Sequence, residues 1–438
     1  MALIQRLFNV RREEVAPVLI ATAYFFCVLT ALMVLRPARD ALGMQRGIEA
    51  VRWLFMGTAV VTLLVNPLFG WLVSRFRRLH FITATYAFFI VSLLCFFGLM
   101  VVAPGAIGVI SGQVFYVWFS VFNLFATMVF WALMADRFSL DQGKRFFALI
   151  AVGGTAGAVF GPWLASVLAQ PLGTPALLPI AAGFLVLATL AAWAVARLQP
   201  ERQDSESQVS EYTMIGGNAW AGLWAVCRSP YLLGIAAYVV ILAVMVTFLY
   251  FTRLQMVAAL GSDVDLRTTV FARIDLITQA TTLVLQGLVA GHLMKRAGVA
   301  FTLALLPLTV ALGFIGLAMV GSLAALIVFE ATFRAVQRAL MRPARETLYT
   351  VVSREDKYKS KAFIDTFVYR TGDVAGAQTE GLLGRLGMGL AALVSVAVPL
   401  ALIWAALGIW LGRTQHRRAQ LLGQDPHNQG GSRHDFPP

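Results

Sequence analysis

The sequence alternates between long apolar stretches and short polar breaks. Twelve of the apolar stretches approach or exceed the roughly 20 residues that a helix needs to cross a bilayer. They cover approximately residues 15–35, 51–74, 80–103, 106–135, 145–169, 175–197, 230–257, 267–292, 299–320, 322–352, 360–386 and 388–412. This pattern predicts an all-α integral membrane protein with twelve transmembrane helices.

One long polar segment divides these helices into two sets of six. It follows Arg197, is rich in Gln, Glu, Ser and Asp, and indicates a cytoplasmic linker at residues 198–229. Its end, from Trp220 to Trp224, is expected on the membrane surface. We therefore expect a six-helix bundle at 1–197, a second at 230–412 and a polar cytoplasmic tail at 413–438, with the two bundles related by pseudo-symmetry.

Composition supports the membrane assignment and argues against an enzyme. Hydrophobic residues make up 59% of the chain and charged residues 13%, with a mean hydropathy of +0.76. A soluble domain has about a quarter of charged residues. The three cysteines are scattered, and no metal-ligand spacing, nucleophile motif or phosphate-binding glycine loop is found. We expect no enzymatic activity, no cofactor and no metal site.

The basic residues predict the orientation of the chain. The net charge is +13, but the basic residues lie in short loops and form no soluble patch, which argues against a nucleic-acid partner. With the odd-numbered helices entering from the cytoplasm, 22 basic residues fall on the cytoplasmic side and 8 on the other. We expect an uncleaved, monomeric, multi-pass protein of the inner (plasma) membrane, with both termini cytoplasmic and the lipid bilayer as its partner.

A charged stripe interrupts the tenth apolar stretch. Glu330, Arg334, Arg338, Arg342 and Arg345 recur every three or four residues, so on a helix they share one face. An arginine at bilayer depth costs at least a few kcal/mol. The stripe predicts an anion pathway; the alternative is a salt-bridged helix whose last arginines extend to the lipid headgroups.

The two halves of the chain repeat each other. GWLVSRFRR from Gly70 matches GHLMKRAG from Gly291, with Gly70 and Arg75 aligned to Gly291 and Arg296. A second pair of similar blocks begins at Ser139 and Ser353. A duplicated six-helix unit is typical of a transporter with a binding site between its halves.

These motifs resemble the major facilitator superfamily. In that family the loop after the second and eighth helices is a gating loop, which the resemblance assigns here to Gly70, Arg75, Gly291 and Arg296. Ser74 and Lys295 replace its aspartate. Gly157, Gly161 and Pro162 are similar to the family's antiporter motif, although close helix packing is the favoured interpretation.

A narrower resemblance is to the bacterial and plastid nucleotide (ATP/ADP) translocases. It rests on LRPARDALG from Leu35, FWALMADRFSLDQGKRFF from Phe130, RPARETLYTVV from Arg342 and KSKAFIDTFVYRTGDVAG from Lys359. It implies an exchange carrier (antiporter) for nucleotide-like anions, with charged contacts at Arg36, Arg39, Asp40, Arg345, Glu346, Lys361, Asp365 and Arg370. Asp373 stands where the family has lysine, and the family's acids on the fourth and seventh helices have no counterpart.

Guanidinium groups are suited to this cargo, because they bind phosphate or carboxylate in a bidentate fork. Helical depth places Arg334, Arg338 and Arg370 near the bilayer centre. Arg36 and Arg39 are then expected at the outer mouth and Arg345 at the inner one. The acidic residues are expected to act as counter-ions or as proton-coupling groups: Asp40, Glu330, Glu346, Asp365 and Asp373. Asp373 is expected to pair with Arg370, and Asp275 with Arg273.

The favoured function is a secondary carrier for a small anionic, phosphate-bearing solute, working by exchange or proton coupling. Two alternatives remain open at this stage. One is a proton-coupled exporter of a drug or lysophospholipid-like amphiphile, with the arginines locked in salt bridges. The other is a non-transporting membrane sensor or assembly partner.

Overall fold

The computed structural model describes residues 14–75, 78–199, 219–387 and 389–424, and their regular structure is helical throughout. The first half forms α2 (Val15–Gly43), α3 (Ile48–Arg75), α4 (Arg78–Val102), α5 (Ala106–Arg137), α6 (Leu140–Leu172) and α7 (Leu177–Leu198), with the short 3₁₀ helices η2 (Met44–Arg46) and η3 (Thr174–Ala176). These helices correspond to the first six predicted spans.

The second half forms α9 (Ala219–Arg228), α10 (Pro230–Ala258), α11 (Val264–Val320) and α16 (Leu390–Gln424). Between α11 and α16 two further helices run through π-helical segments. One comprises α12 (Leu323–Val336), η4 (Gln337–Met341), α13 (Arg342–Leu348) and the 3₁₀ helix η5 (Tyr349–Val351). The other comprises α14 (Arg354–Phe363), η6 (Ile364–Val368) and α15 (Tyr369–Arg385).

The twelve-helix prediction is confirmed. α11 contains the eighth and ninth spans, which meet at Gly298, where the backbone has a φ of 72°. Within the described residues, nine helices are long and apolar enough to cross a membrane. The eighth, tenth and eleventh spans fall outside that set. All three carry several charged residues, and these residues need partners inside the bilayer.

Two helix ends differ from the prediction. α2 was expected to end at residue 35 but continues to Gly43, so Arg36, Arg39 and Asp40 lie inside a helix. α16 continues to Gln424, so the first part of the predicted polar tail is helical. In both cases charged residues end the apolar run without ending the helix.

The described chain separates into two compact units. Unit 1 comprises Met1–Thr213 with Arg253–Ala280, and unit 2 comprises Met214–Thr252 with Thr281–Pro438. The stretch Arg253–Ala280 thus belongs by its contacts to unit 1, although it comes from the second half of the sequence. It contains the end of α10 and the start of α11.

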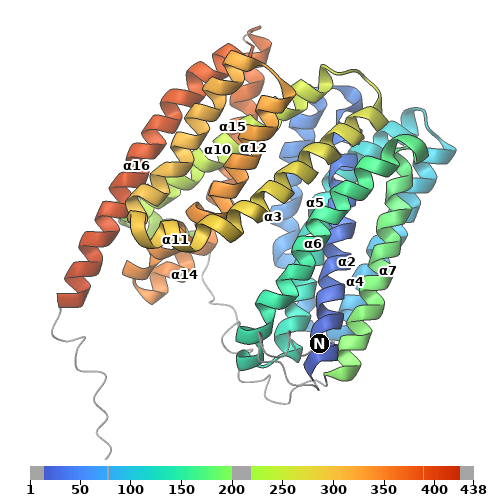
Figure 1. The fold of residues 1–438 in the computed structure, drawn as a ribbon, viewed down its shortest axis with the longest axis horizontal. Helices are drawn as coiled ribbons and strands as arrows, with labels where there is room; N and C mark the ends of the chain where they lie inside the picture. The colour runs from blue at the N-terminus through green and yellow to red at the C-terminus, as the bar shows by residue number, and fades with distance from the viewer. Residues whose placement is uncertain (1–13, 76–77, 200–218, 388, 425–438) are drawn as a thin grey trace, which may run out of the picture. The chain divides into compact units, whose positions relative to one another are not determined.

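α2 is the central helix of unit 1 and packs against α5, α6 and α7 (Figure 1). α6 approaches it closely because glycines face its backbone. A Cβ atom added at Gly153 would lie 2.2 Å from the Thr22 carbonyl oxygen, and one at Gly157 would lie 2.4 Å from that of Phe26. The favoured interpretation of the Gly157 motif as a close helix contact is therefore confirmed.

The same device recurs in unit 2, where α15 packs on α10. A Cβ atom at Gly372 would lie 2.7 Å from the Val240 carbonyl oxygen, and one at Gly376 would lie 3.1 Å from that of Val244. The helices that carry these glycine pairs also begin alike. Ser139 caps the start of α6, and Ser353 caps the start of α14, which leads into α15. The sequence repeat thus corresponds to a structural one.

Candidate functional site

A cluster of five charged side chains lies in unit 1, three of them buried and two partly buried; we call it the unit 1 cluster. It comprises Arg36, Arg39 and Asp40 on α2, Arg253 near the end of α10, and Asp275 on α11. Asp40, Arg253 and Asp275 are each only 1% exposed. Buried charges of this kind are tolerated only when they are paired, since desolvation costs several kcal/mol per ion.

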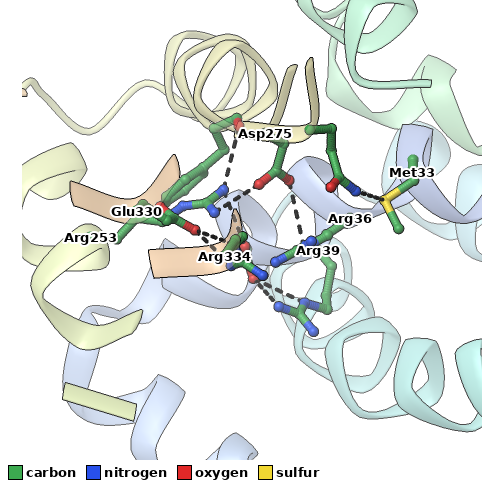
Figure 2. Close-up of polar contacts among 10 residues, drawn as sticks. Met33, Arg36, Arg39, Arg253, Asp275, Glu330 and Arg334 are labelled. Carbon is green, nitrogen blue, oxygen red and sulfur yellow. Dashed lines mark hydrogen bonds and ion pairs between the residues drawn. The ribbon is translucent and has the colours of Figure 1, made fainter. Parts of the chain in front are cut away.

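Arg253 is the central member of this cluster (Figure 2). Its Nη1 donates to Oδ1 of Asp275 at 2.8 Å, and its Nη2 lies 3.9 Å from Oδ2 of Asp40. Its guanidinium also lies 5.0 Å from the ring centre of Phe271. Arg253 therefore links an aspartate of α2 to an aspartate of α11.

The remaining arginines complete the cluster from α2. Nε of Arg36 lies 3.6 Å from Oδ2 of Asp275 (Figure 2), and Nε of Arg39 donates to Oδ1 of Asp40 at 2.9 Å. The Arg39 guanidinium also lies 4.9 Å from the ring centre of Tyr116 on α5. Three arginines and two aspartates give the cluster a formal charge of +1.

The expected pairing of Asp275 with Arg273 is wrong. Asp275 is buried and pairs with Arg253 and Arg36, whereas Arg273 is exposed. Residues two apart on a helix point in different directions, so the two side chains do not share a face. Sequence reasoning did not identify Arg253 as a site residue, although a charged residue within the seventh apolar span, 230–257, was the available signal.

Other contacts hold Arg253–Ala280 within unit 1. The Thr174 backbone N–H donates to Oδ1 of Asp265 at 2.6 Å, and the hydroxyls of Thr174 and Thr268 are 2.8 Å apart. Ala272 lies in a buried cluster with small and apolar residues of α2, α6 and α7, namely Val34, Ala38, Ala165, Ala169 and Leu177. The ion pairs are thus part of a packed and hydrogen-bonded contact.

Three arginine–carboxylate pairs lie among the described residues of unit 2, and we call them the unit 2 pairs: Arg334–Glu330, Arg345–Asp365 and Arg370–Asp373. Nε and Nη2 of Arg334 both donate to Oε1 of Glu330, at 3.0 and 2.6 Å (Figure 2). Nη2 of Arg345 lies 3.1 Å from Oδ1 of Asp365.

The third pair forms the contact that the sequence predicted. Nη1 of Arg370 donates to Oδ2 of Asp373 at 3.1 Å, and the Thr247 hydroxyl lies 3.5 Å from the other carboxylate oxygen. Thr247 comes from α10, at the point where α15 packs closely on it. Sequence reasoning did not identify Thr247, because a threonine in an apolar span carries no distinctive signal.

Two of these pairs combine a buried acid with a half-exposed arginine. The side chains of Glu330 and Asp373 are 2% and 5% exposed, whereas those of Arg334 and Arg370 are 23% and 31% exposed. A guanidinium has five N–H donors, so a single carboxylate does not use all of them. Each arginine can therefore hold its own acid and still donate to a second anion.

The π-helical segments adjoin the unit 2 pairs. η4 carries Arg338, whose side chain is half-buried, and η6 carries Asp365. A π segment inserts one extra residue into a helix and is frequent at functional sites. The tenth and eleventh spans therefore each shift the register of their side chains within the region that bears the charges.

The other predicted residues divide into two groups. Glu346 is exposed and pairs with Lys361. Gly70, Arg75, Gly291 and Arg296 lie on helical backbone outside the residues whose side chains the structure describes. Their expected role in gating stays a prediction. The predicted substrate residues fall into both units, with Arg36 and Arg39 in unit 1 and Arg334, Arg338, Arg345 and Arg370 in unit 2.

Solved structures with the same fold are transporters of varied cargo. A bacterial homologue of the human lysosomal transporter Spinster shares 14% identity over 93% of this chain and 99% of its own, with a TM-score of 0.59. The nucleoside transporter NupG shares 12% identity over 92% and 99%, with a TM-score of 0.63. A bacterial homologue of the iron transporter ferroportin shares 13% identity over 91% and 98%, with a TM-score of 0.64. These likenesses concern the fold alone.

Sequence comparison gives the family directly. Among curated proteins no relative matches this chain. The family model described as Major Facilitator Superfamily, by contrast, matches residues 9–341, which is most of the chain. With an all-helical, multi-pass membrane architecture and transporter folds as its structural neighbours, the chain belongs to the major facilitator superfamily.

Proposed function

We propose that this chain is a secondary carrier of the inner membrane that moves a small anionic, phosphate-bearing solute by alternating access. The observation that carries the proposal is the geometry of the Arg334–Glu330 and Arg370–Asp373 pairs. In each pair the carboxylate is buried and the guanidinium is partly exposed with donors to spare. Such an arginine can donate to a phosphate oxygen while it still holds its internal counter-ion.

In this mechanism the acidic residues neutralise the arginines of the empty binding site. Glu330 and Asp373 hold Arg334 and Arg370 in place while no solute is bound, which avoids an unpaired charge at bilayer depth. An arriving phosphate then shares the guanidinium donors in a bidentate fork. Nucleotide-like cargo is the form suggested by the resemblance to the nucleotide translocases.

Coupling can take one of two forms in this scheme. In exchange, a second anion replaces the first before the carrier returns. In proton coupling, Asp373 accepts a proton and releases Arg370 to the solute. Proteoliposome uptake with and without an imposed pH gradient separates the two, because only proton coupling responds to the gradient in the absence of internal solute.

The unit 1 cluster is proposed as a latch. It joins α2 to the end of α10 and the start of α11, and an alternating-access cycle requires such a contact to form and break. The contact consists of ion pairs, and in this scheme water replaces the paired ions around each charge when the contact opens. Its expected location is the outer side of the membrane, as given by the orientation predicted from the basic residues.

A thermal-shift panel tests the anionic cargo. Purified protein is heated with matched compounds that differ only in phosphate: ADP against adenosine, and a hexose phosphate against the hexose. A bound ligand raises the unfolding midpoint in proportion to the logarithm of its concentration over its Kd. We expect stabilisation by the phosphorylated member of at least one pair. The proposal is contradicted if the neutral members stabilise the protein, or if none of the anions does.

A second candidate function is export of an amphiphile. It is favoured by an apolar groove of about 500 Å³ on α4 and α5. Within the groove the rings of Phe96 and Trp118 pack edge to face, with their centroids 5.6 Å apart. The groove is lined by Ala87, Phe88, Val91, Ser92, Cys95, Phe96, Leu99 and Trp118. Lysophospholipids in the same thermal-shift panel test this candidate.

A further inference from the structure

We propose that α9 and α14 together form a binding surface for the headgroups of anionic phospholipids in the cytoplasmic leaflet. This inference rests on the membrane topology and is independent of the proposed cargo. It concerns the last part of the linker, which the sequence suggested to lie on the membrane surface. Both helices belong to unit 2.

α9 is held directly against α14. Its Gly222 faces α14 so closely that a Cβ atom there would lie 2.7 Å from the Lys359 carbonyl oxygen and 2.8 Å from Cβ of Phe363. The start of α10, which follows α9 directly, is also anchored, because the Tyr231 hydroxyl donates to the Leu348 carbonyl oxygen at 2.9 Å. α9 therefore has a fixed place in unit 2.

The opposite face of α9 presents an exposed aromatic and a cation. Trp224 is 61% exposed, Arg228 is exposed, and the Arg228 guanidinium lies 5.3 Å from the centre of the Trp224 ring. Val226 on the same short helix is buried, so α9 has an inner and an outer side. Tryptophan with a neighbouring arginine is typical of helices that lie at the boundary between headgroups and acyl chains.

The charge of the two helices fits an anionic surface. α9 contains Arg228 and no acidic residue. α14 contains four basic and two acidic residues. One of the acids, Asp356, is hydrogen-bonded to Ser353, the residue that caps the start of α14. Glu346, an exposed acid of α13, pairs with Lys361. The pair of helices thus has a formal charge of +3 from its own sequence, on the side of the membrane predicted to carry most basic residues.

The surface connects to the unit 2 pairs. α14 continues without a break into η6, whose Asp365 pairs with Arg345 on α13. Lys361, near the end of α14, pairs with Glu346 and also lies 5.8 Å from the ring centre of Tyr349. A headgroup that binds the lysines of α14 therefore contacts the helix that continues into η6 and whose Asp365 holds Arg345.

Hydrogen–deuterium exchange on the full-length protein in nanodiscs tests the proposal. Nanodiscs of phosphatidylglycerol mixed with phosphatidylcholine are compared with phosphatidylcholine alone. We expect slower exchange of the α9 and α14 amides in the anionic lipid. A third arm adds soluble glycerol phosphate to the phosphatidylcholine nanodiscs, and no slowing is expected there. Equal exchange in both lipids, or equal slowing by glycerol phosphate, overturns the proposal.

Substitutions of two exposed residues of α9, with a matched control, test whether these side chains cause the slower exchange in anionic lipid. Arg228→Gln should reduce the lipid-dependent slowing by about fivefold, the share of one basic residue at an anionic surface. Trp224→Ala should weaken it in the same direction. Arg417→Gln, which removes another exposed arginine, from α16, should leave it unchanged. An Arg228→Gln protein that retains the full effect contradicts the proposal.

Discussion

Nη1 of Arg253 donates a hydrogen bond to Oδ1 of Asp275 at 2.8 Å, and each of the two residues is only 1% exposed to solvent. They lie near the end of α10 and in the early part of α11, and Arg253 also reaches Asp40 on α2. Arg253 and Asp275 also pair with Asp40 and Arg36 of α2, and these contacts join Arg253–Ala280 to the first half of the chain, in keeping with its place in unit 1.

Breaking this pair on one side should be more damaging than removing both partners. Arg253→Gln or Asp275→Asn leaves a buried charge without its main counter-ion, at a cost of about 3–5 kcal/mol. The double variant removes both charges and should recover part of that loss. The unfolding midpoint in detergent, followed by tryptophan fluorescence, measures the effect.

Arg273 provides the control for this prediction. It lies two residues from Asp275 on the same helix but is exposed, so Arg273→Gln should leave the midpoint unchanged. A loss of stability with Arg273→Gln comparable to that with Arg253→Gln is inconsistent with the assigned pairing.

Removing the internal counter-ions should strengthen binding of an anionic solute. Glu330→Gln and Asp373→Asn free the donors of Arg334 and Arg370 that the carboxylates now occupy. A hydrogen bond to a charged group contributes about 1.5–3 kcal/mol, so the Kd of a phosphorylated ligand should fall by about tenfold. Isothermal titration of the variants with the best ligand of the thermal-shift panel measures it. An unchanged or higher Kd in both variants assigns these acids a purely structural role.

The glycine contact between α2 and α6 should not tolerate a methyl group. Gly157→Ala places a Cβ atom 2.4 Å from the Phe26 carbonyl oxygen, so the helices must move apart, at a cost of about 1–3 kcal/mol. Gly183→Ala on α7 has nothing within 4 Å of the new Cβ atom and should be neutral or slightly stabilising. Thermal unfolding of the two variants side by side gives the comparison. Equal midpoints would refute the close packing.

The membrane architecture was readable from the sequence because most of the spans are long apolar runs. The repeat was also readable, because Ser139 and Ser353 cap corresponding helices and the glycines that follow meet α2 and α10. The spans depend on local composition, and the repeat depends on serine and glycine at corresponding positions of the two halves.

The charged contacts were only partly readable. Arg370 and Asp373 lie three residues apart on one helix, so spacing alone predicted their contact. The partners of Asp275 come from α2 and α10, and nothing in the spacing along α11 indicates them. The π segments η4 and η6 were also missed, since a one-residue shift leaves the apolar pattern almost unchanged.

The central claim is that Arg334 and Arg370 receive the phosphate of the solute, and uptake into proteoliposomes tests it most directly. Wild type, Arg334→Gln, Arg370→Gln and the control Arg417→Gln are reconstituted and supplied with radiolabelled nucleotides and hexose phosphates, each beside its dephosphorylated form. We expect wild type and Arg417→Gln to take up a phosphorylated compound selectively, and the other two variants to lose that uptake. Normal, phosphate-selective uptake by both Arg334→Gln and Arg370→Gln would contradict the account.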